Sequence, residues 1–413
     1  MNLYLAIILT ALFGEFVLRD AARYLNLNSL DKTLPGEFSG FYDEEKYSQS
    51  QEYTKAKAIF AYFSSSFDVV LIAAFIVLGG FNLVDQFVRG LELNPIFTGL
   101  AFFGLLYFAQ DIISIPFVLY HNFVIEERFG FNKMTAKIFV LDKVKSYGLV
   151  FILGSILLGG ILFFFEIAGA YAWLYAWAFV SIFIIAAQPL FTTVIAPLFN
   201  KFTPLDEGDL RSGIQHYADK VGFALKEICV MDGSKRSAHS NAYFSGFLKK
   251  RIALFDTLMD RHSVEEMVAI IAHEVGHYKR RHVLKGMILS IIHTGILLFL
   301  LSLFVENRGL FDAFRMESVS VYAGLVFFSI LYSPIELVLS IVMNAISRKH
   351  EYEADAFAAE TTGSAEPLIL ALKHLSVANL GNLTPHALTV FLNYSHPPVL
   401  QRIAALRERW VRA

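Results

Sequence analysis

The stretch VEEMVAIIAHEVGHYKRRH, residues 264–282, decides how this chain is interpreted. Its apolar residues recur at helical spacing, which predicts a helix. On a helix, residues four positions apart lie on one face, one turn apart. The sequence therefore predicts that His273 and His277 offer two imidazole nitrogens to a single metal ion, with Glu274 beside them.

The order His-Glu-x-x-His within a helix is typical of zinc peptidases. The two histidines bind the ion, and the glutamate is the general base that takes a proton from water. Ser263, followed three residues later by Glu266, has the pattern of a capping box and predicts where the helix begins. A buried helix with two incidental histidines is the alternative at this point, and a third ligand elsewhere argues against it.

The composition indicates a membrane protein. The 413 residues are 55% hydrophobic and only 17% charged, and mean hydropathy is +0.52, whereas soluble domains are about 25% charged. A net charge of −2 without a dense basic tract argues against nucleic acid as a partner. The single cysteine, Cys229, excludes an internal disulfide and a cysteine-rich zinc site.

Apolar segments that are long enough, or nearly so, to cross a bilayer predict about seven transmembrane helices. The first is short and carries Glu15, and we expect it to be a retained membrane helix because it lacks the features of a cleaved signal peptide. The predicted fold class is a mainly α, multi-pass membrane protein with a zinc peptidase domain that carries a small β-sheet. The predicted spans are 3–18, 59–81, 98–120, 147–166, 172–196, 283–305 and 319–345, with loops at 19–58 and 121–146 among the connections.

Two domains are predicted. Residues 1–197 hold five spans and their loops, and residues 198–413 form a zinc metallopeptidase domain that includes the membrane hairpin 283–345. Because a hairpin returns the chain to the same side, the polar regions on either side of it emerge on one face.

The polar region before the hairpin contains a helix near 206–222 and three short strand-like runs. These runs are Glu227–Met231, Asn241–Phe244 and Arg251–Phe255. A small sheet beside the metal helix can receive a peptide as an added strand. We therefore expect Asn241, Ala242 and Tyr243 to bind substrate, although strand residues of this kind are more often structural.

Lysine and arginine counts predict the orientation. The loop 121–146 has four lysines (Lys133, Lys137, Lys143 and Lys145), whereas the loops on the other side have only Arg89, Arg308 and Arg315. The positive-inside rule then places the His-Glu-x-x-His region and the C-terminus in the cytoplasm. The C-terminal sequence RWVRA has no endoplasmic-reticulum retrieval signal, which favours a bacterial inner membrane over the endoplasmic reticulum membrane of a eukaryote.

Several ionisable residues fall within the predicted spans. Charges at membrane depth usually face a bundle interior or a water-filled cavity. Interhelical hydrogen bonding explains them equally well, and no catalytic role is assigned to them. They are Asp68, Asp111, Glu166, His293 and Glu336.

The third metal ligand is sought among the carboxylates of SRKHEYEADAFAAE, residues 347–360. Glu351 and Asp355 are four residues apart and share a helix face, whereas Glu353 points about 160° away from it. Glu351 is thus the predicted third ligand, with Glu353 as the next choice. Asp355 is expected to bond a ligand histidine from behind, which fixes the ring's tautomer.

HEVGH, followed beyond a membrane hairpin by SRKHEYEADAFA, resembles the gluzincin (M48) family of integral-membrane CAAX prenyl proteases, the Ste24 type. The segments 234–258, 393–403 and 120–133 are also similar to this family. The family pattern N/S-R-x-x-E-x-x-A-D is matched by Ser347, Arg348, Glu351, Ala354 and Asp355.

The resemblance implies one Zn²⁺ per chain and seven helices around a large water-filled chamber. It also implies that Asn241 binds the substrate main chain or the developing negative charge, and that His396 approaches the same charge. The implied reaction removes the C-terminal tripeptide of prenylated CaaX proteins or peptides at the bilayer. The alternatives are a general quality-control protease for membrane proteins and, outside the enzymes, a metal-binding transporter or receptor.

Overall fold

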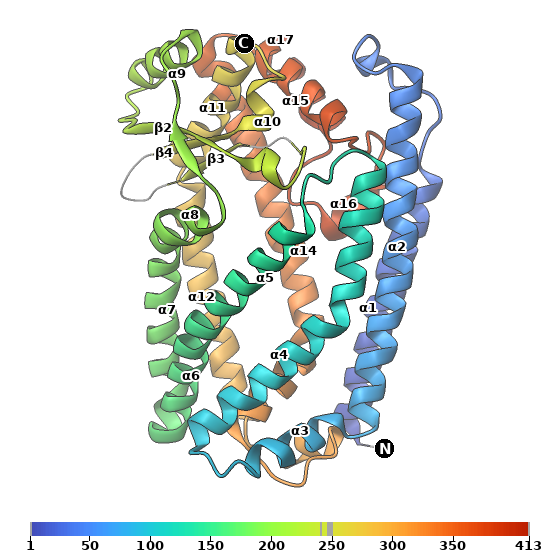
Figure 1. Cartoon of the computed structure of the whole chain (residues 1–413), viewed down its shortest axis with the longest axis vertical. Coiled ribbons are helices and arrows are strands. Elements are labelled where there is room, and N and C mark those ends of the chain that lie inside the picture. The colour runs from blue at the N-terminus through green and yellow to red at the C-terminus, as the bar shows by residue number, and fades with distance from the viewer. Residues whose placement is uncertain (1, 240–241, 246–250, 412–413) are drawn as a thin grey trace.

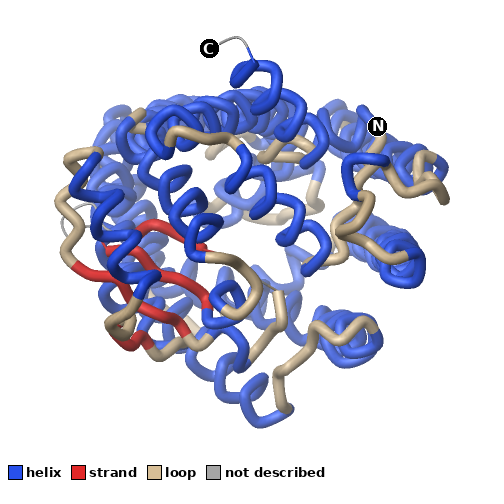
Figure 2. Tube along the Cα trace, turned by 90° about the horizontal axis from the view of Figure 1, so that it is seen from above, coloured by secondary structure: helices blue, strands red, loops and turns tan. Residues whose placement is uncertain are grey.

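The computed structural model describes residues 2–239, 242–245 and 251–411. Long helices run along the molecule, and the β-sheet and several shorter helices gather at one end of it (Figure 1). The C-terminus lies at that end and the N-terminus at the opposite end. Seen from above, the helices are arranged in a ring and the strands lie to one side of it (Figure 2).

The described elements follow one another along the chain as a series of helices interrupted by one group of strands. The α-helices are α1 (Leu3–Asn28), α2 (Glu44–Val77), α3 (Gly80–Arg89), α4 (Pro95–Tyr120), α5 (Ala136–Leu149), α6 (Ser155–Ile167), α7 (Ala172–Leu190), α8 (Ala196–Phe199), α9 (Asp209–Lys220), α10 (Asp256–Met259), α11 (Val264–Lys279), α12 (His282–Phe304), α13 (Arg308–Ala313), α14 (Val321–Thr362), α15 (Glu366–Ala378), α16 (Ala387–Asn393) and α17 (Val399–Val411). The π-helical segments are η2 (His121–Glu126), η3 (Val150–Gly154) and η5 (Phe191–Ile195), and the strands are β1 (Phe202–Pro204), β2 (Glu227–Met231), β3 (Ala242–Ser245) and β4 (Arg251–Phe255).

The predicted fold class is confirmed. Within the described part of the chain, six helices are long and apolar enough to cross a membrane, and each overlaps one of the predicted spans. The first predicted span forms most of α1, which packs beside α2 but is not among these six. No more than 17% of any of the six apolar windows is buried inside the protein. Few residues of these helices are fully enclosed by protein, as expected for a ring of helices.

The helices extend beyond the apolar segments, so the predicted loops are shorter than expected. Residues 19–28 continue α1, and α2 begins at Glu44, where the Asp43 side chain accepts a hydrogen bond from the Lys46 backbone N–H (2.6 Å). In the predicted loop 121–146, η2 and the first part of α5 are helical. Charged residues sustain a helix in water as well as apolar ones do in lipid, so hydropathy alone underestimated these lengths.

The sheet has four described strands in the order β1-β2-β4-β3. β2 and β4 are parallel, with Ile228 beside Ile252, and the other two pairs are antiparallel. β2 and β4 match the predicted runs and β3 is displaced by one residue, while β1 was not predicted. β3 is last in this order, so it forms an edge of the sheet, and it contacts α11.

The ionisable residues in the spans have different surroundings. Asp111 on α4 accepts hydrogen bonds from Lys143 Nζ (2.6 Å) and Tyr147 Oη (2.5 Å) of α5, as expected for interhelical bonding. His293 on α12 lies 3.3 Å from the Glu336 carboxylate of α14. Asp68 and Glu166 are exposed on the protein surface. Asp111 thus links α4 to α5, and the contact between His293 and Glu336 links α12 to α14.

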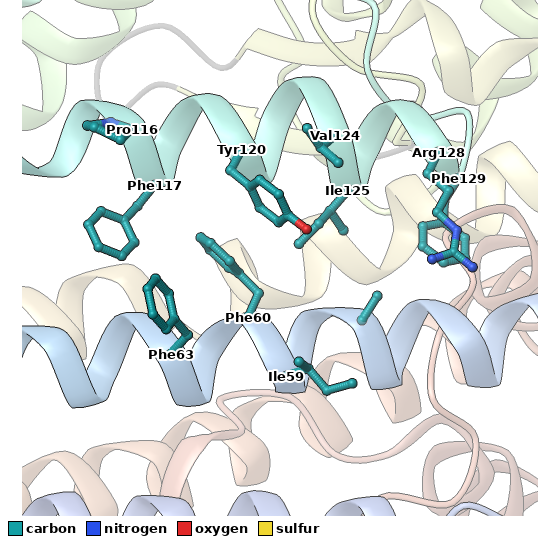
Figure 3. A pocket seen from close by; sticks show the side chains of 11 residues that line it. Ile59, Phe60, Phe63, Pro116, Phe117, Tyr120, Val124, Ile125, Arg128 and Phe129 are labelled. Carbon is teal, nitrogen blue, oxygen red and sulfur yellow. The ribbon is translucent and has the colours of Figure 1, made fainter.

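An apolar groove lies between α2 and the continuous helix formed by α4 and η2 (Figure 3). Its volume is about 510 Å³. The Phe60 and Tyr120 rings stack across it with centroids 5.5 Å apart, and Arg128 stands at one end of the row of side chains. The groove is lined by Ala56, Ile59, Phe60, Phe63, Pro116, Phe117, Tyr120, Val124, Ile125, Arg128 and Phe129.

Candidate metal centre

The helix that carries the two histidines begins where the sequence predicts. The Ser263 hydroxyl accepts a hydrogen bond from the Glu266 backbone N–H (3.2 Å), which caps the first turn of α11. The Glu266 carboxylate instead lies against His262 (2.7 Å) and His374 (2.8 Å). Those separations are hydrogen-bond lengths, too short for co-ligands of one ion, so this group is a link between α11 and α15.

The close approach of α11 to α14 forms the centre of the site. A β-carbon at Gly276 would lie 3.1 Å from the Cα atom and 3.1 Å from the carbonyl oxygen of Ala354. A β-carbon here would require the facing backbone to shift by a few tenths of an ångström. The glycine of HEVGH and the alanine of the second motif thus let the two helices touch, and this contact brings Glu351 up to the imidazoles.

His273, His277 and Glu351 place their ligand atoms around one point. The two Nε2 atoms are 3.1 Å apart, His277 Nε2 is 3.2 Å from Glu351 Oε1, and His273 Nε2 is 3.5 Å from Glu351 Oε2. Atoms bound about 2.0–2.1 Å from a tetrahedral zinc ion lie about 3.3–3.4 Å apart. The three observed separations bracket that value.

The surroundings of Glu351 also fit a metal ion. Its Oε2 atom is buried, and among the described residues it makes no hydrogen bond. A buried carboxylate oxygen without a hydrogen bond is costly unless positive charge lies beside it, and the nearby Arg402 and a bound metal ion would both supply such charge. Two imidazoles and one carboxylate are also the donor set expected for a catalytic zinc with an open fourth position.

Asp355 orients the first imidazole. The His273 Nδ1–H donates to Asp355 Oδ1 (2.8 Å), which leaves the Nε2 lone pair facing His277 and Glu351. Arg402 of α17 donates to both oxygens of Asp355, from Nε to Oδ2 (2.8 Å) and from Nη2 to Oδ1 (2.6 Å). The structure therefore brings Asp355 to the position that its spacing from Glu351 predicts.

Arg402 was not predicted as a site residue. Besides Asp355, it approaches Glu351, with Nη1 3.4 Å from Oε2. Burial alone lowers the pKa of the Arg402 guanidinium, but the charge and hydrogen bonds of Asp355 and the charges of Glu351 and Glu274 outweigh burial and raise this pKa. A signal was present in the sequence, since Arg402 falls within the segment 393–403 that resembles the family.

Glu274 and His396 flank the three converging side chains. Glu274 is half-buried on α11, one residue after His273. Burial lowers the pKa of His277, but its hydrogen bond with Glu351 and the charges of Glu351 and Glu274 dominate and raise it. His396 is exposed, and its Nε2 atom lies 3.5 Å from Glu351 Oε1. His396 is thus within reach of a ligand at this centre, and Glu274 is close enough to raise the pKa of His277.

Arg348 of the second motif holds the segment that carries His396. Its Nη1 atom donates to the carbonyl oxygens of Tyr394 (2.6 Å) and Val390 (3.3 Å). These bonds tether the end of α16 to α14, two residues before His396. Arg348 therefore positions the segment that carries His396.

Two of the remaining predicted substrate residues lie in β3. Asn241 falls outside the described residues. Ala242 and Tyr243 are in β3, paired with Leu254 and Ala253 of β4. Their backbone belongs to the edge strand that contacts α11.

Two family models together match most of the chain. The model described as "CAAX prenyl protease N-terminal, five membrane helices" matches residues 23–201, and that of peptidase family M48 matches residues 204–410. CAAX prenyl protease 1 of Saccharomyces cerevisiae is 33% identical over 426 residues, covering 95% of this chain and 93% of that protein. A CAAX prenyl protease 1 homolog of Arabidopsis thaliana is 37% identical over 401 residues, covering 93% of each.

The fold is also similar to that of a solved structure. The crystal structure of S. mikatae Ste24p superposes with a TM-score of 0.91 at 34% sequence identity. The match covers 98% of this chain and 99% of that protein. The similarity therefore includes both the ring of membrane helices and the helices that carry the metal centre.

Proposed function

Since this chain belongs to peptidase family M48, a family of metallopeptidases, we propose that it is a zinc-dependent membrane endopeptidase that cleaves prenylated CaaX proteins or peptides. The product of this reaction is the substrate without its C-terminal tripeptide. The proposal rests on the full-length similarity to CAAX prenyl proteases and on one structural observation.

That observation is the convergence of His273, His277 and Glu351 at separations of 3.1–3.5 Å. The three side chains come from two helices that are joined through the membrane-spanning α12. A transporter or receptor could use such ligands, but it has no need for a carboxylate next to them. Glu274 supplies that carboxylate, and this favours hydrolysis.

In the proposed reaction, a bound ion would act as a Lewis acid and would activate water near neutral pH. The Glu274 carboxylate accepts a proton from the water as its oxygen attacks the scissile carbonyl carbon. When the C–N bond breaks, Glu274 donates this proton to the leaving amine nitrogen. We assign to His396 and Asn241 the role of stabilising the negative charge that develops on the carbonyl oxygen.

The substrate peptide is proposed to bind as an added strand along β3. An edge strand offers unpaired N–H and C=O groups, which give affinity through main-chain hydrogen bonds. Ala242 and Tyr243 supply this edge. Because β3 contacts α11, a peptide paired with it runs close to His273 and His277.

The isoprenyl chain is proposed to bind in the groove between α2 and α4. The aromatic and aliphatic lining suits a hydrocarbon chain, and about 510 Å³ is in the usual range for ligand pockets. The groove lies near the segment that precedes β3, because Glu126, beside the groove residue Ile125, contacts His239 (3.1 Å). His239 precedes β3 by three residues.

The same proposal takes zinc as the natural metal. It also includes the domain boundary between residues 197 and 198 and the orientation of the protein in the membrane. The four lysines from Lys133 to Lys145 favour a cytoplasmic location for the end of the molecule that carries the metal centre. Among membranes, we propose the bacterial inner membrane, with the endoplasmic reticulum membrane as the equivalent in a eukaryote.

A cleavage assay with the purified full-length protein in vesicles tests this function. Farnesylated and unmodified CaaX peptides of the same sequence are compared, each with and without a zinc chelator. The expected result is release of the tripeptide from the farnesylated peptide, abolished by the chelator and restored by added Zn²⁺. Equal cleavage of both peptides would contradict the prenyl preference, and cleavage that survives the chelator would contradict the metal mechanism.

A further inference from the structure

His282 contacts one of the two histidines of the candidate metal centre. It is 5% exposed and is the first residue of α12. Its Nδ1 atom is 3.0 Å from Nδ1 of His277, and its Nε2 atom is 3.1 Å from Oε2 of Glu353. Three side chains thus form a continuous chain of contacts that ends at a metal ligand.

Only one arrangement of protons satisfies this chain when His277 binds a metal through Nε2. His277 then carries its proton on Nδ1 and donates it to the Nδ1 lone pair of His282. His282 in turn carries its proton on Nε2 and donates it to the Glu353 carboxylate. Each donor meets one acceptor, so the contacts fix the tautomer and the plane of both rings.

A break in the helix makes this contact possible. In a continuous helix, His282 would point about 140° away from His277, five residues earlier. Arg281, between α11 and α12, instead has a left-handed conformation (φ 57°), which turns the chain. A non-glycine residue in this conformation is uncommon. The turn directs His282 back toward His277.

Two other side chains contact the pair without joining its chain of hydrogen bonds. The His350 ring stacks on the His282 ring, with centroids 3.9 Å apart and an interplanar angle of 8°. Lys349 Nζ lies 3.9 Å from Glu353, at an exposed position. Glu353 is on the side of α14 that faces away from the ligand Glu351, as its phase on the helix predicts. It is therefore placed to act through His282 and not as a ligand itself.

We propose that His282 and Glu353 are positioning residues that orient His277 for metal binding, as Asp355 and Arg402 orient His273. The inference rests on the proposed zinc site, but it assigns two residues that the reaction itself does not require. Such partners behind a ligand histidine typically change metal affinity by about 10–100-fold. Each of the two histidine ligands then has its own carboxylate. His273 contacts Asp355 directly, whereas His277 reaches Glu353 through the imidazole of His282.

The test is a zinc titration of the metal-free full-length protein against a competing chelating dye. H282A is expected to weaken zinc binding by about 10–100-fold, and E353A by a smaller factor in the same range. H282N is expected to lie close to the wild type, because an asparagine oxygen near the Nδ1 position can still accept the His277 proton. H350A, which removes the stacked ring and leaves the chain of contacts intact, is the matched control and should bind zinc as the wild type does.

Cobalt substitution supplies a readout that packing alone does not change. The visible absorption of the Co²⁺-loaded protein is expected to shift in H282A and to stay unchanged in H350A. The inference is overturned if H282A and E353A bind zinc as the wild type does, or if H350A weakens zinc binding as much as H282A. It is also overturned if H282N is as weak as H282A while it remains folded. A wild-type protein that binds no zinc overturns the proposed function itself, which separates the two failures.

Discussion

Gly276 of α11 and Ala354 of α14 touch backbone to backbone, because a β-carbon at Gly276 would lie 3.1 Å from the Ala354 Cα and carbonyl oxygen. Each residue belongs to one of the two motifs that carry the proposed metal ligands. The contact sets the distance between the helices, and so it sets the distance between His277 and Glu351.

Replacing Gly276 with alanine is expected to separate the helices and weaken zinc binding. Overpacking of this kind costs about 1–3 kcal/mol, more than the gain of about 1 kcal/mol that alanine brings to a helix. Thermal unfolding in detergent and zinc content measure the two effects. Gly286→Ala is the matched control, since nothing lies within 4 Å of its β-carbon position in α12. If both variants prove equally stable and equally rich in zinc, the contact does not have this role.

Glu274→Gln is expected to retain zinc and stability but to lower kcat by about 10²–10⁴-fold, the usual contribution of general acid–base catalysis. The amide keeps the shape of the side chain and cannot accept the proton. Metal analysis and the farnesyl-peptide assay are the measurements. Glu265→Gln, an exposed change on the same helix, should leave the rate unchanged. Wild-type activity in Glu274→Gln would remove this residue from the mechanism.

Arg402→Met is expected to destabilise the fold by about 3–5 kcal/mol, because it leaves the buried Asp355 and Glu351 without their cation. Arg409→Met on the same helix removes an exposed ion pair with Glu360 (2.9 Å) and should cost less than about 1 kcal/mol. Reversible unfolding in mixed micelles gives both values. Added zinc should recover part of the loss in Arg402→Met, since the ion also compensates Glu351. Similar costs for the two variants would mean that Arg402 does not hold the carboxylates together.

Phe117→Ala is expected to raise KM for the farnesylated peptide and to leave KM for the unmodified peptide unchanged. Phe117 packs near Phe63 and Phe67, with ring centroids 5.9 Å and 5.0 Å away, so its loss removes apolar surface from the groove. Phe87→Ala, an exposed aromatic change on α3, is the control. An equal change in KM for both peptides would show that the groove does not bind the isoprenyl chain.

Local spacing in the sequence predicted the parts of the site that lie on single helices. His273 and His277 are one turn apart, and the shared phase of Glu351 and Asp355 separated both from Glu353. Arg402 could not be predicted from spacing, because only the packing of α17 against α14 brings it to Asp355. His282 depends on a single left-handed residue, which sequence periodicity does not reveal.

In the fold, too, some features could be predicted from the local sequence and others could not. Hydropathy located the apolar segments but not the ends of α1 and α2, which charged residues extend into the polar regions. β1 was missed because it has only three residues and includes Pro204, which a strand tolerates at an edge position.

The central claim is that two histidines and one glutamate hold a single ion. Metal analysis of the purified wild type and of Glu351→Gln tests it most directly, with Glu360→Gln, an exposed change on the same helix, as the control. The expected result is one zinc per chain in the wild type and in Glu360→Gln, and loss of zinc in Glu351→Gln. Full zinc occupancy in Glu351→Gln would contradict the claim.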